Sequence, residues 1–357
     1  MKPTSIEELQ SIVCSHPRLI PHGSRSKSAL ILYDGVLQLD LTGFNGMIQY
    51  IPSEYTFTAW AGTKIEEIEH ILDKNNQFLP FDPPLVKHRA TLGGTVASGL
   101  SASGRYRYGG LRDFVLGVTY MDGNGQLVHA GGKVVKNAAG FDIPKLMVGS
   151  LGGLGALLEL SFKVFPKPLS YSTVTAYYSS LPDALDKLLI LTATPLDLYC
   201  LDLEPQEGDN VILKVRIGGK PDSFTERIQR LVGILGNGEA IEGNQEIAYW
   251  SEVREFSWLP DNCALIKVPL TPNRVTKIDA FLSARNKKRR YTVGANIAWI
   301  GWDGPIEALD KYLMESGLPG LVVIGSPGHP RIGYRKNESF AHRIKQALDP
   351  SGRWIEI

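Results

Sequence analysis

The chain has 357 residues, of which 43% are hydrophobic and 21% are charged, and its formal net charge is +1. This length suffices for two domains with a sizeable core, and the balanced charge gives no sign of a nucleic-acid partner or an anionic membrane surface. The N-terminus lacks the apolar stretch of a secretory signal, and no run approaches the roughly 18 apolar residues of a membrane span. We therefore expect a cytoplasmic protein without a transmembrane segment, and leave open a peripheral position at the inner face of the membrane through partner subunits.

The first 80 residues predict a small α/β unit. Thr63 and Glu66 fit a capping box, in which the hydroxyl and the carboxylate satisfy free N–H groups. Apolar residues at helical spacing follow, and Asn75 can end the helix. Before this helix, short β-branched or alternating runs predict strands at 36–41, 47–50 and 55–60.

Glycine is concentrated in the next part of the chain. Residues 93–155 hold 16 of the 37 glycines, although they are fewer than a fifth of the chain. Glycine is used where φ must be positive or where backbone must approach a ligand closely. Apolar runs at 114–120, 127–130 and 157–164 separate these glycines, so we predict short strands whose turns lie against a large flat ligand. We infer that this ligand is a flavin.

Two prolines, Pro166 and Pro168, close the glycine-rich region, and a change of composition after them predicts a domain boundary near residue 170. Alternating strands and helices then favour an α+β cap with an antiparallel sheet. We interpret the charge run 287–290 as a solvated helix end, with docking to an acidic partner as the alternative. The predicted strands are 172–178, 198–203, 211–217, 263–268, 291–300 and 321–324, and the predicted helices are 181–191, 223–235, 275–284, 305–315 and 340–348.

The three cysteines are far apart and form no C-x-x-C pair. Their spacing argues against a disulfide framework, a zinc site or an iron–sulfur cluster carried by this chain alone. We therefore expect no metal site, and we expect Cys14, Cys200 and Cys263 to be buried, reduced thiols.

The common nucleotide-binding and hydrolase motifs are missing from the sequence. There is no G-x-G-x-x-G after a strand, no G-x-x-x-x-G-K-[ST] and no G-x-S-x-G. Two other segments could hold phosphate. Residues 21–27 combine hydroxyls and cations in a short loop, for which a plain surface turn is the alternative. Residues 91–99 are rich in small side chains, for which a tight β-turn is the alternative.

Taken in order, these segments resemble one family. The matching motifs are T-L-G-G-T-V-A-S-G at 91–99, R-D-F-V-L-G-V at 112–118, K-N-A-A-G-F-D at 136–142 and G-S-L-G-G-L-G at 149–155. The chain resembles the FAD-binding subunits of glycolate oxidase complexes, in the vanillyl-alcohol-oxidase (PCMH-type) flavoprotein superfamily. The resemblance is good over residues 20–170 and weak beyond them.

This resemblance implies an α+β protein with a PCMH-type FAD-binding domain, residues 1–170, made of two α/β subdomains that divide near residue 82. An α+β cap at 171–335 and a C-terminal helix and tail at 336–357 would follow, the tail returning to the FAD-binding domain. The residues implied in FAD binding are His22, Gly23, Ser24, Arg25, Ser26 and Lys27 in a first phosphate loop, Thr91, Leu92, Gly93, Gly94, Thr95, Ala97 and Ser98 in a second, Gly104, Tyr108, Gly109 and Asp113 near the ring, and Lys136, Asn137, Gly140 and Asp142 on the adenosine or ring side.

The chain departs from the family at several points. The family's first loop usually reads R-G-x-G-S-K, whereas here His22 replaces the arginine and Arg25 replaces a glycine, so that either the turn differs or Arg25 itself pairs with phosphate. Relatives with covalent flavin have a histidine where Ser26 stands, so we expect non-covalent FAD. The usual N-P-G near the C-terminus is replaced by residues 354–357, and we expect the return of the tail to be altered.

The family's late histidine-rich motif, H-x-H-x-G-D-G-N, is also missing, and the sequence predicts no catalytic residue. The resemblance implies a flavoprotein subunit of a complex that oxidises glycolate or a similar 2-hydroxy acid, with a catalytic flavosubunit and an iron–sulfur subunit as partners. A stand-alone FAD dehydrogenase is an alternative, with Trp299, Trp302 and Arg331 beside a substrate, although core packing also explains the tryptophans. A third possibility is a flavin-binding scaffold without turnover.

Overall fold

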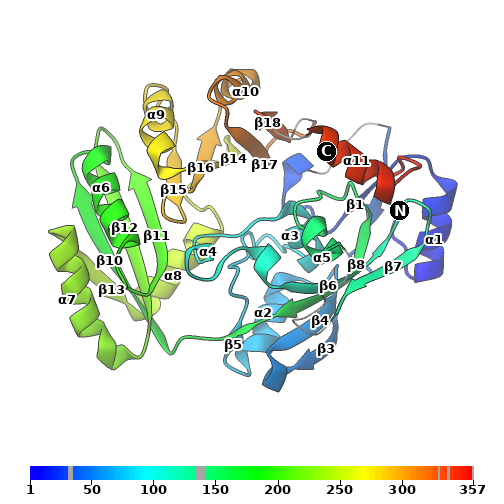
Figure 1. The fold of residues 1–357 in the computed structure, drawn as a ribbon, viewed down its shortest axis with the longest axis horizontal. Coiled ribbons are helices and arrows are strands. Elements are labelled where there is room, and N and C mark those ends of the chain that lie inside the picture. Colours follow the sequence, from blue (N-terminus) through cyan, green and yellow to red (C-terminus); the bar gives the residue numbers. More distant parts are fainter. Residues whose placement is uncertain (31–34, 133–140, 329, 336–337, 356–357) are drawn as a thin grey trace.

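The computed structural model describes residues 1–30, 35–132, 141–328, 330–335 and 338–355. In this part of the chain two large antiparallel sheets form two lobes that lie side by side (Figure 1). The lobe on the right of the view holds a five-stranded sheet in the order β3-β4-β8-β6-β7. Its strands are β3 (Met47–Ile51), β4 (Thr56–Trp60), β6 (Val115–Met121), β7 (Leu127–Gly131) and β8 (Ala156–Lys163).

The second lobe holds a nine-stranded sheet in the order β13-β10-β12-β11-β15-β16-β14-β17-β18, and it begins at Ser170. Strands with alternating burial, such as β12, place one side chain in two on each face. The strands are β10 (Ser170–Tyr178), β11 (Leu198–Pro205), β12 (Val211–Gly219), β13 (Glu239–Glu242), β14 (Ala264–Pro269), β15 (Arg289–Thr292), β16 (Ile297–Trp302), β17 (Pro319–Ile324) and β18 (Arg331–Gly333).

Helices cover one face of this sheet. α6 (Leu181–Thr192) is amphipathic, and Ser180 caps it by accepting a hydrogen bond from the Asp183 N–H. Its leucines pack into the same core as α7 (Phe224–Leu235), α9 (Pro272–Ser283) and α10 (Ile306–Glu315). The opposite face contributes Leu265, Trp299 and Val323 to the core of the five-stranded lobe. The two lobes therefore share buried apolar contacts.

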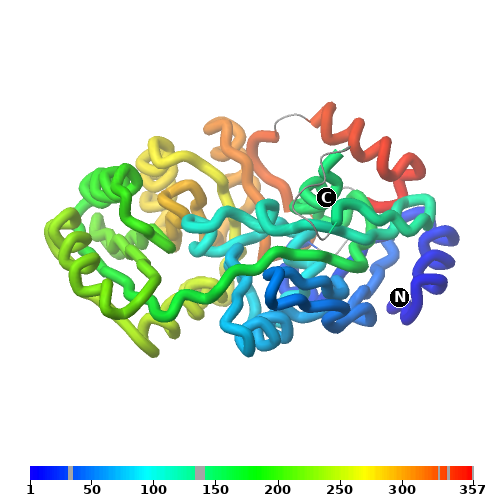
Figure 2. Tube along the Cα trace, turned by 60° about the horizontal axis from the view of Figure 1, so that its bottom comes forward, coloured from blue at the N-terminus to red at the C-terminus, as the bar shows by residue number. Residues whose placement is uncertain are grey.

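The N-terminal segment and the C-terminal tail meet at the edge of the first lobe (Figure 2). α1 (Ile6–Ser15) precedes a parallel pair of strands, β1 (Leu19–His22) and β2 (Leu37–Asp40). After α11 (Glu338–Leu348), the chain forms a bridge from Trp354 to Leu19. Trp354 is fully buried there, so the tail returns to the first lobe although it lacks the usual N-P-G.

The strand predicted at 291–300 is wrong, because the chain turns within it. Val293, Gly294 and Ala295 all have positive φ, and β15 and β16 on either side of them pair with each other. The run 287–290 is likewise not a solvated helix end. Arg289 and Arg290 lie in β15 instead. Arg289 forms an ion pair with Asp279 and Arg290 forms one with Glu204, so both charges are neutralised within the chain.

The capping box at Thr63 is also wrong. α2 (Ile65–Asp73) has Lys64 as its N-cap residue, and the Thr63 hydroxyl exchanges hydrogen bonds with the backbone of Gly46 instead. A helix that the sequence analysis missed is α8 (Gly243–Arg254), which contacts β10. Its buried positions include Glu246, so it has no clear apolar face by which it could be recognised.

Cys200 is buried, as expected, but Cys14 is exposed because α1 lies on the surface, and Cys263 is partly exposed. Within the described ranges, no helix is long and apolar enough to cross a membrane.

Candidate functional site

Two segments far apart in sequence converge at the carboxyl end of β1. The loop at 21–27 follows this strand, and α3 (Leu92–Ser98) begins opposite it, with Thr91 as its N-cap residue. One small cavity is lined by the loop together with Thr91, Gly94, Ala97 and Ser98. An adjoining one adds glycines from two other loops, Gly62 in one and Gly152 and Gly155 in the other. We call this concave region the cradle, made of residues 21–27, 91–98, Gly62, Gly152 and Gly155.

The cradle leaves no room for side chains at its glycines. A Cβ atom on Gly23 would lie 2.2 Å from Thr91 Oγ1, and one on Gly62 would lie 2.5 Å from two backbone carbonyl oxygens. Gly155 has a φ of +149°. Backbone therefore forms this wall directly, as expected where a chain must approach a ligand closely.

The first loop carries several hydrogen-bond donors that have no acceptor among the described residues. The backbone N–H groups of residues 23–27 donate to no acceptor among the described residues. The Ser24 hydroxyl is buried and has no hydrogen-bond partner there either. Successive free N–H groups in a turn form an anion-binding concavity. A diphosphate fits this arrangement, because it would satisfy groups that are otherwise left without partners.

Lys27 supplies the positive charge of the cradle. Its side chain is 4% exposed, and among the described residues its ammonium bonds only to the Ser26 hydroxyl, at 3.3 Å. Burial lowers the Lys27 pKa to about 8, and the charge of Glu255 partly opposes this shift. A buried ammonium without an acid in contact is costly, and an anionic ligand would compensate for that cost.

Arg25 has a φ of +63°, in the left-handed region that glycine adopts most readily. Its guanidinium donates to Gln38 Oε1 at 2.6 Å and to His22 Nε2 at 3.1 Å. His22 Nδ1 donates to the carbonyl of Gly23, which leaves Nε2 to accept from Arg25, and burial lowers the His22 pKa. Arg25 is thus bonded within the chain, and both alternatives that the sequence raised for it, a different turn or a contact with phosphate, stay predictions.

The second segment is a short helix, so the β-turn alternative is wrong. The Leu92 and Thr95 side chains are fully buried, and the N–H groups of Leu92 and Gly93 donate to Thr63 and Ala61. Thr91, Gly94, Ala97 and Ser98 line the cradle, whereas Leu92 and Thr95 support it from behind.

The residues expected near the flavin ring do not lie at the cradle, and they are not close together. Gly104 and Tyr108 line a different, larger cavity. Asp113 accepts a hydrogen bond from the Gly110 N–H and closes a short turn beside Gly109. Asp142 is the N-cap residue of α5 (Ile143–Met147). The predicted residues Lys136, Asn137 and Gly140 lie outside the described residues.

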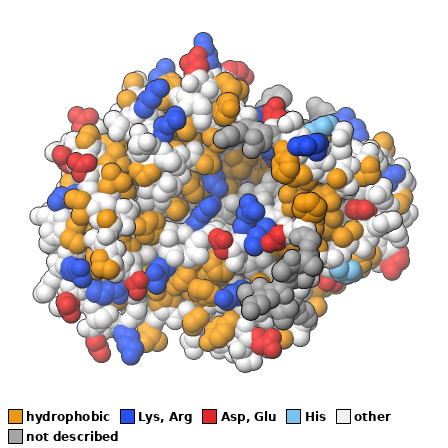
Figure 3. All heavy atoms as spheres, in the orientation of Figure 1, with side chains coloured by type: hydrophobic (Ala, Val, Ile, Leu, Met, Phe, Trp, Pro, Cys, Tyr) orange, Lys and Arg blue, Asp and Glu red, His pale blue; other side chains and the backbone are white. Residues whose placement is uncertain are grey.

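Two cations that the sequence analysis missed are Lys267, on the nine-stranded sheet, and Arg105, in α4 (Arg105–Tyr108). Lys267 on β14 stands opposite Trp299 on β16, so the two side chains share the face that packs on that lobe. Lys267 is 9% exposed, and burial together with the charge of Arg105 lowers its pKa to about 8. Arg105 begins α4, inside the segment expected near the ring. Lysine and arginine side chains gather in the hollow between the lobes (Figure 3).

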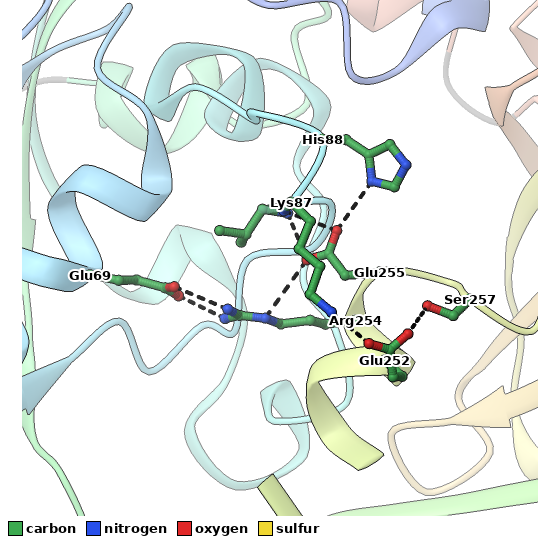
Figure 4. A network of polar contacts seen from close by, with 8 residues as sticks. Glu69, Lys87, His88, Glu252, Arg254, Glu255 and Ser257 are labelled. Atoms are coloured by element: carbon green, nitrogen blue, oxygen red, sulfur yellow. Dashed lines mark hydrogen bonds and ion pairs between the residues drawn. The ribbon is translucent and has the colours of Figure 1, made fainter. Parts of the chain in front are cut away.

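A polar network joins the lobes behind the cradle (Figure 4). Glu255, just after α8, accepts hydrogen bonds from the N–H groups of Val86 and Lys87. Arg254 makes two hydrogen bonds to Glu69 of α2, at 2.7 and 3.1 Å. These contacts fix the position of the second lobe relative to the loop that precedes α3.

The tryptophans considered as substrate contacts are core residues. Trp302 stacks on Phe281 within the helix-covered core, and Trp299 packs on Phe256 in the core shared by the lobes. Arg331 lies on the surface in β18. No group of three His, Cys, Asp or Glu side chains in the described ranges is placed to hold a metal ion.

Comparison with known proteins gives consistent matches. A family model described as "FAD binding domain" matches residues 1–131. Glycolate oxidase subunit GlcE of Escherichia coli (strain K12) is 34% identical over 353 residues, which cover 97% of this chain and 94% of the relative. Glycolate oxidase subunit GlcD of Bacillus subtilis (strain 168) is 29% identical, over 56% of this chain and 44% of the relative.

The D-lactate dehydrogenase [cytochrome] 1, mitochondrial, of Saccharomyces cerevisiae is 26% identical over 88% of this chain and 56% of the relative. Among solved structures, an alkyldihydroxyacetonephosphate synthase superposes with a TM-score of 0.71 at 15% identity, over 99% of this chain and 74% of the other. This likeness concerns the fold, and it extends over both lobes.

Proposed function

The chain belongs to the family of FAD-binding oxidoreductases that includes glycolate oxidase subunit GlcE, and from this premise we propose that it works on glycolate or a similar 2-hydroxy acid. We place it in a complex with a second flavosubunit and an iron–sulfur subunit that takes the electrons. The observation that carries the proposal is the cradle, with its unpaired N–H groups beside the buried Lys27.

The cradle residues suit the diphosphate of a non-covalent FAD. The N–H groups of residues 23–27 and the Ser24 hydroxyl would donate to its oxygens, and Lys27 would neutralise part of its charge. Ser26 offers no histidine for a covalent bond. When bound, FAD supplies the two-electron oxidation of the carbon that bears the substrate hydroxyl.

FAD affinity is expected to fall as the pH rises through about 8. Lys27 in the free protein loses its proton there because burial lowers its pKa. A bound diphosphate favours the ammonium, so the complex keeps the proton to higher pH, and the affinity is greatest below pH 8. Flavin-fluorescence titrations between pH 7 and 9 measure this dependence. Lys27→Met should weaken FAD binding at least tenfold at pH 7 and flatten the pH dependence.

Lys64→Met is the matched control for this prediction. Lys64 lies near the cradle's open side but pairs with Glu67 and is half-exposed. This variant should keep both the affinity and the pH dependence. If the Lys27→Met variant kept the wild-type dependence, Lys27 would have no part in holding the diphosphate.

On the substrate side, the structure offers Lys267 and Arg105. The Lys267 ammonium is buried and makes no hydrogen bond or ion pair with a described residue, and burial and the like charge of Arg105 both lower its pKa. Two cations in a part-buried place favour a small carboxylate. We therefore assign the carboxylate of the 2-hydroxy acid to this pair.

Lys267→Met is expected to reduce the rate of glycolate-driven flavin reduction at least tenfold in the assembled complex, without loss of bound FAD. It should also raise the Tm, because it removes a cation that folding disfavours. Lys288→Met, the same change at an exposed position, should alter neither quantity. Unchanged kinetics in the Lys267 variant would remove this residue from the substrate site.

The test of the function itself is anaerobic addition of glycolate to the FAD-loaded chain, alone and with its partner subunits, while flavin absorbance is followed. Bleaching only in the complex supports the proposal, and bleaching of the isolated chain supports a stand-alone dehydrogenase. If no 2-hydroxy acid reduced the flavin, even in the complex, the proposed activity would be wrong and the result would support a flavin-binding scaffold without turnover.

A further inference from the structure

A second cavity, of about 430 Å³, lies between the lobes, and it shares no lining residue with the cradle. α2, the segment 77–83 and α4 form one side, and β10, β11, β12 and α8 form the other. Its volume is in the range of sites for small organic ligands, roughly 300–1,000 Å³. Neither the proposed diphosphate site nor the proposed carboxylate site uses it.

Aromatic rings form much of its wall. Tyr199 meets Tyr108 and Tyr171 edge to face, with ring centroids 5.6 and 5.5 Å apart, and Tyr108 meets Phe78 in the same way at 5.6 Å. Trp250 of α8 adds a further ring to the lining. Rings that hold one another at these angles lose little freedom when a flat ligand enters, so the cavity suits a planar ring system.

Two arginines are held rigidly at this wall. The Arg216 guanidinium lies 3.8 Å from the centre of the Tyr171 ring and donates to Glu246 from Nε and Nη2, at 2.7 and 3.0 Å. Its Nη1 has no acceptor among the described residues. Arg254 is held by Glu69, and its buried Nε is directed toward Glu255 Oε1, at 3.9 Å (Figure 4). Arg216 therefore offers a fixed N–H group to a carbonyl oxygen, whereas the N–H groups of Arg254 are directed at Glu69 and Glu255.

The charges around the cavity decide between a neutral and an anionic ligand. Besides His70, its lining has three cations, Lys167, Arg216 and Arg254, and three carboxylates, Glu69, Asp73 and Asp82. Glu246 behind Arg216 adds a further negative charge. Because the positive charges are balanced, the cavity gives an anion no net attraction, in contrast to Lys27 in the cradle.

We infer that this cavity is a second ligand site, which takes a neutral planar ring bearing carbonyl oxygens, the chemistry of a quinone head group. The aromatic side chains stack on the faces of this ring, and the Nη1 group of Arg216 donates to one of its oxygens. The cavity is lined by Gly104 and Tyr108, which belong to the segment expected near the flavin ring. On that expectation, a ligand in this cavity would lie in the same region between the lobes as the cofactor.

The probe for the test is duroquinone, whose fully methylated ring does not alkylate Cys200 at the wall. Isothermal titration calorimetry of the full chain, with and without FAD, should show one site per chain and the same Kd within threefold. Ile247 lines the cavity but is 60% exposed, so Ile247→Trp can obstruct the cavity without disturbing a core. This variant should weaken duroquinone binding at least tenfold and keep its FAD affinity.

Ile190→Trp is the matched control, because Ile190 lies on α6, is 50% exposed and does not line the cavity. It should bind duroquinone as the wild type does. Three results would overturn the inference: no binding up to the solubility of the probe, equal binding in the Ile247→Trp variant, or displacement of the probe by FAD. The last would assign the cavity to the flavin site itself.

Discussion

Gly23→Ala is expected to weaken FAD binding at least tenfold, which corresponds to about 1.4 kcal/mol or more. The added methyl carbon would lie 2.2 Å from Thr91 Oγ1, a distance that no real contact allows. Either Thr91 rotates and gives up the hydrogen bond that it accepts from the Gly94 N–H, or the loop moves away from α3. Both movements displace the free N–H groups of residues 23–27. Flavin-fluorescence titration of the purified variant measures the loss.

A second substitution tests whether this steric conflict is the cause. Glycine is tolerated at an N-cap position at a cost of only a few tenths of a kcal/mol, so Thr91→Gly should leave α3 intact. The double variant Gly23→Ala/Thr91→Gly should then bind FAD more tightly than Gly23→Ala alone. Gly233→Ala, in α7 with open space around the new methyl group, should have no effect on FAD. Wild-type affinity in Gly23→Ala would show that the diphosphate does not bind at this loop.

The strands of both lobes could largely be predicted, because alternation and β-branched runs are local signals. The predictions failed where a tertiary contact overrides a local preference. Thr63 has the sequence of a helix cap, but its hydroxyl bonds to Gly46, which is distant in sequence. The turn at 293–295 contains Gly294, but it also uses positive φ at Val293 and Ala295, which disfavour this conformation, and it has no Asn-Gly or Asp-Gly pair to mark it.

The two halves of the candidate site were predictable to different degrees. The cradle depends on backbone and on glycines, whose spacing is visible in the sequence. Lys267 has no such signal, since a single lysine in a strand is ordinarily exposed. Only the pairing of β14 with β16 shows that it shares a buried face with Trp299, and only the fold brings it near Arg105. Buried cationic residues of this kind can therefore be identified only from the structure.

Trp354→Ala is expected to destabilise the first lobe by about 3–5 kcal/mol, the usual cost of removing a large buried aromatic side chain. Trp354 is fully buried against Leu9, Leu19 and Leu39, and its backbone continues the β1–β2 pair. Thermal unfolding should show a Tm lower by roughly 5 °C or more, given about 2–4 °C per kcal/mol in a domain of 150–250 residues.

The same substitution should also reduce FAD binding, although Trp354 lies outside the cradle. Lys345 of α11 donates to the carbonyl of Trp354 and to that of Gly153, which is beside Gly152 of the cradle. Loosening the tail therefore weakens the contact of Lys345 with Gly153, which holds the loop of Gly152 in place at the cradle. Phe340→Ala removes an exposed aromatic residue from the same helix and should change neither the Tm nor the affinity. If Trp354→Ala lowered the Tm but kept full FAD affinity, the tail would stabilise the lobe without shaping the cradle.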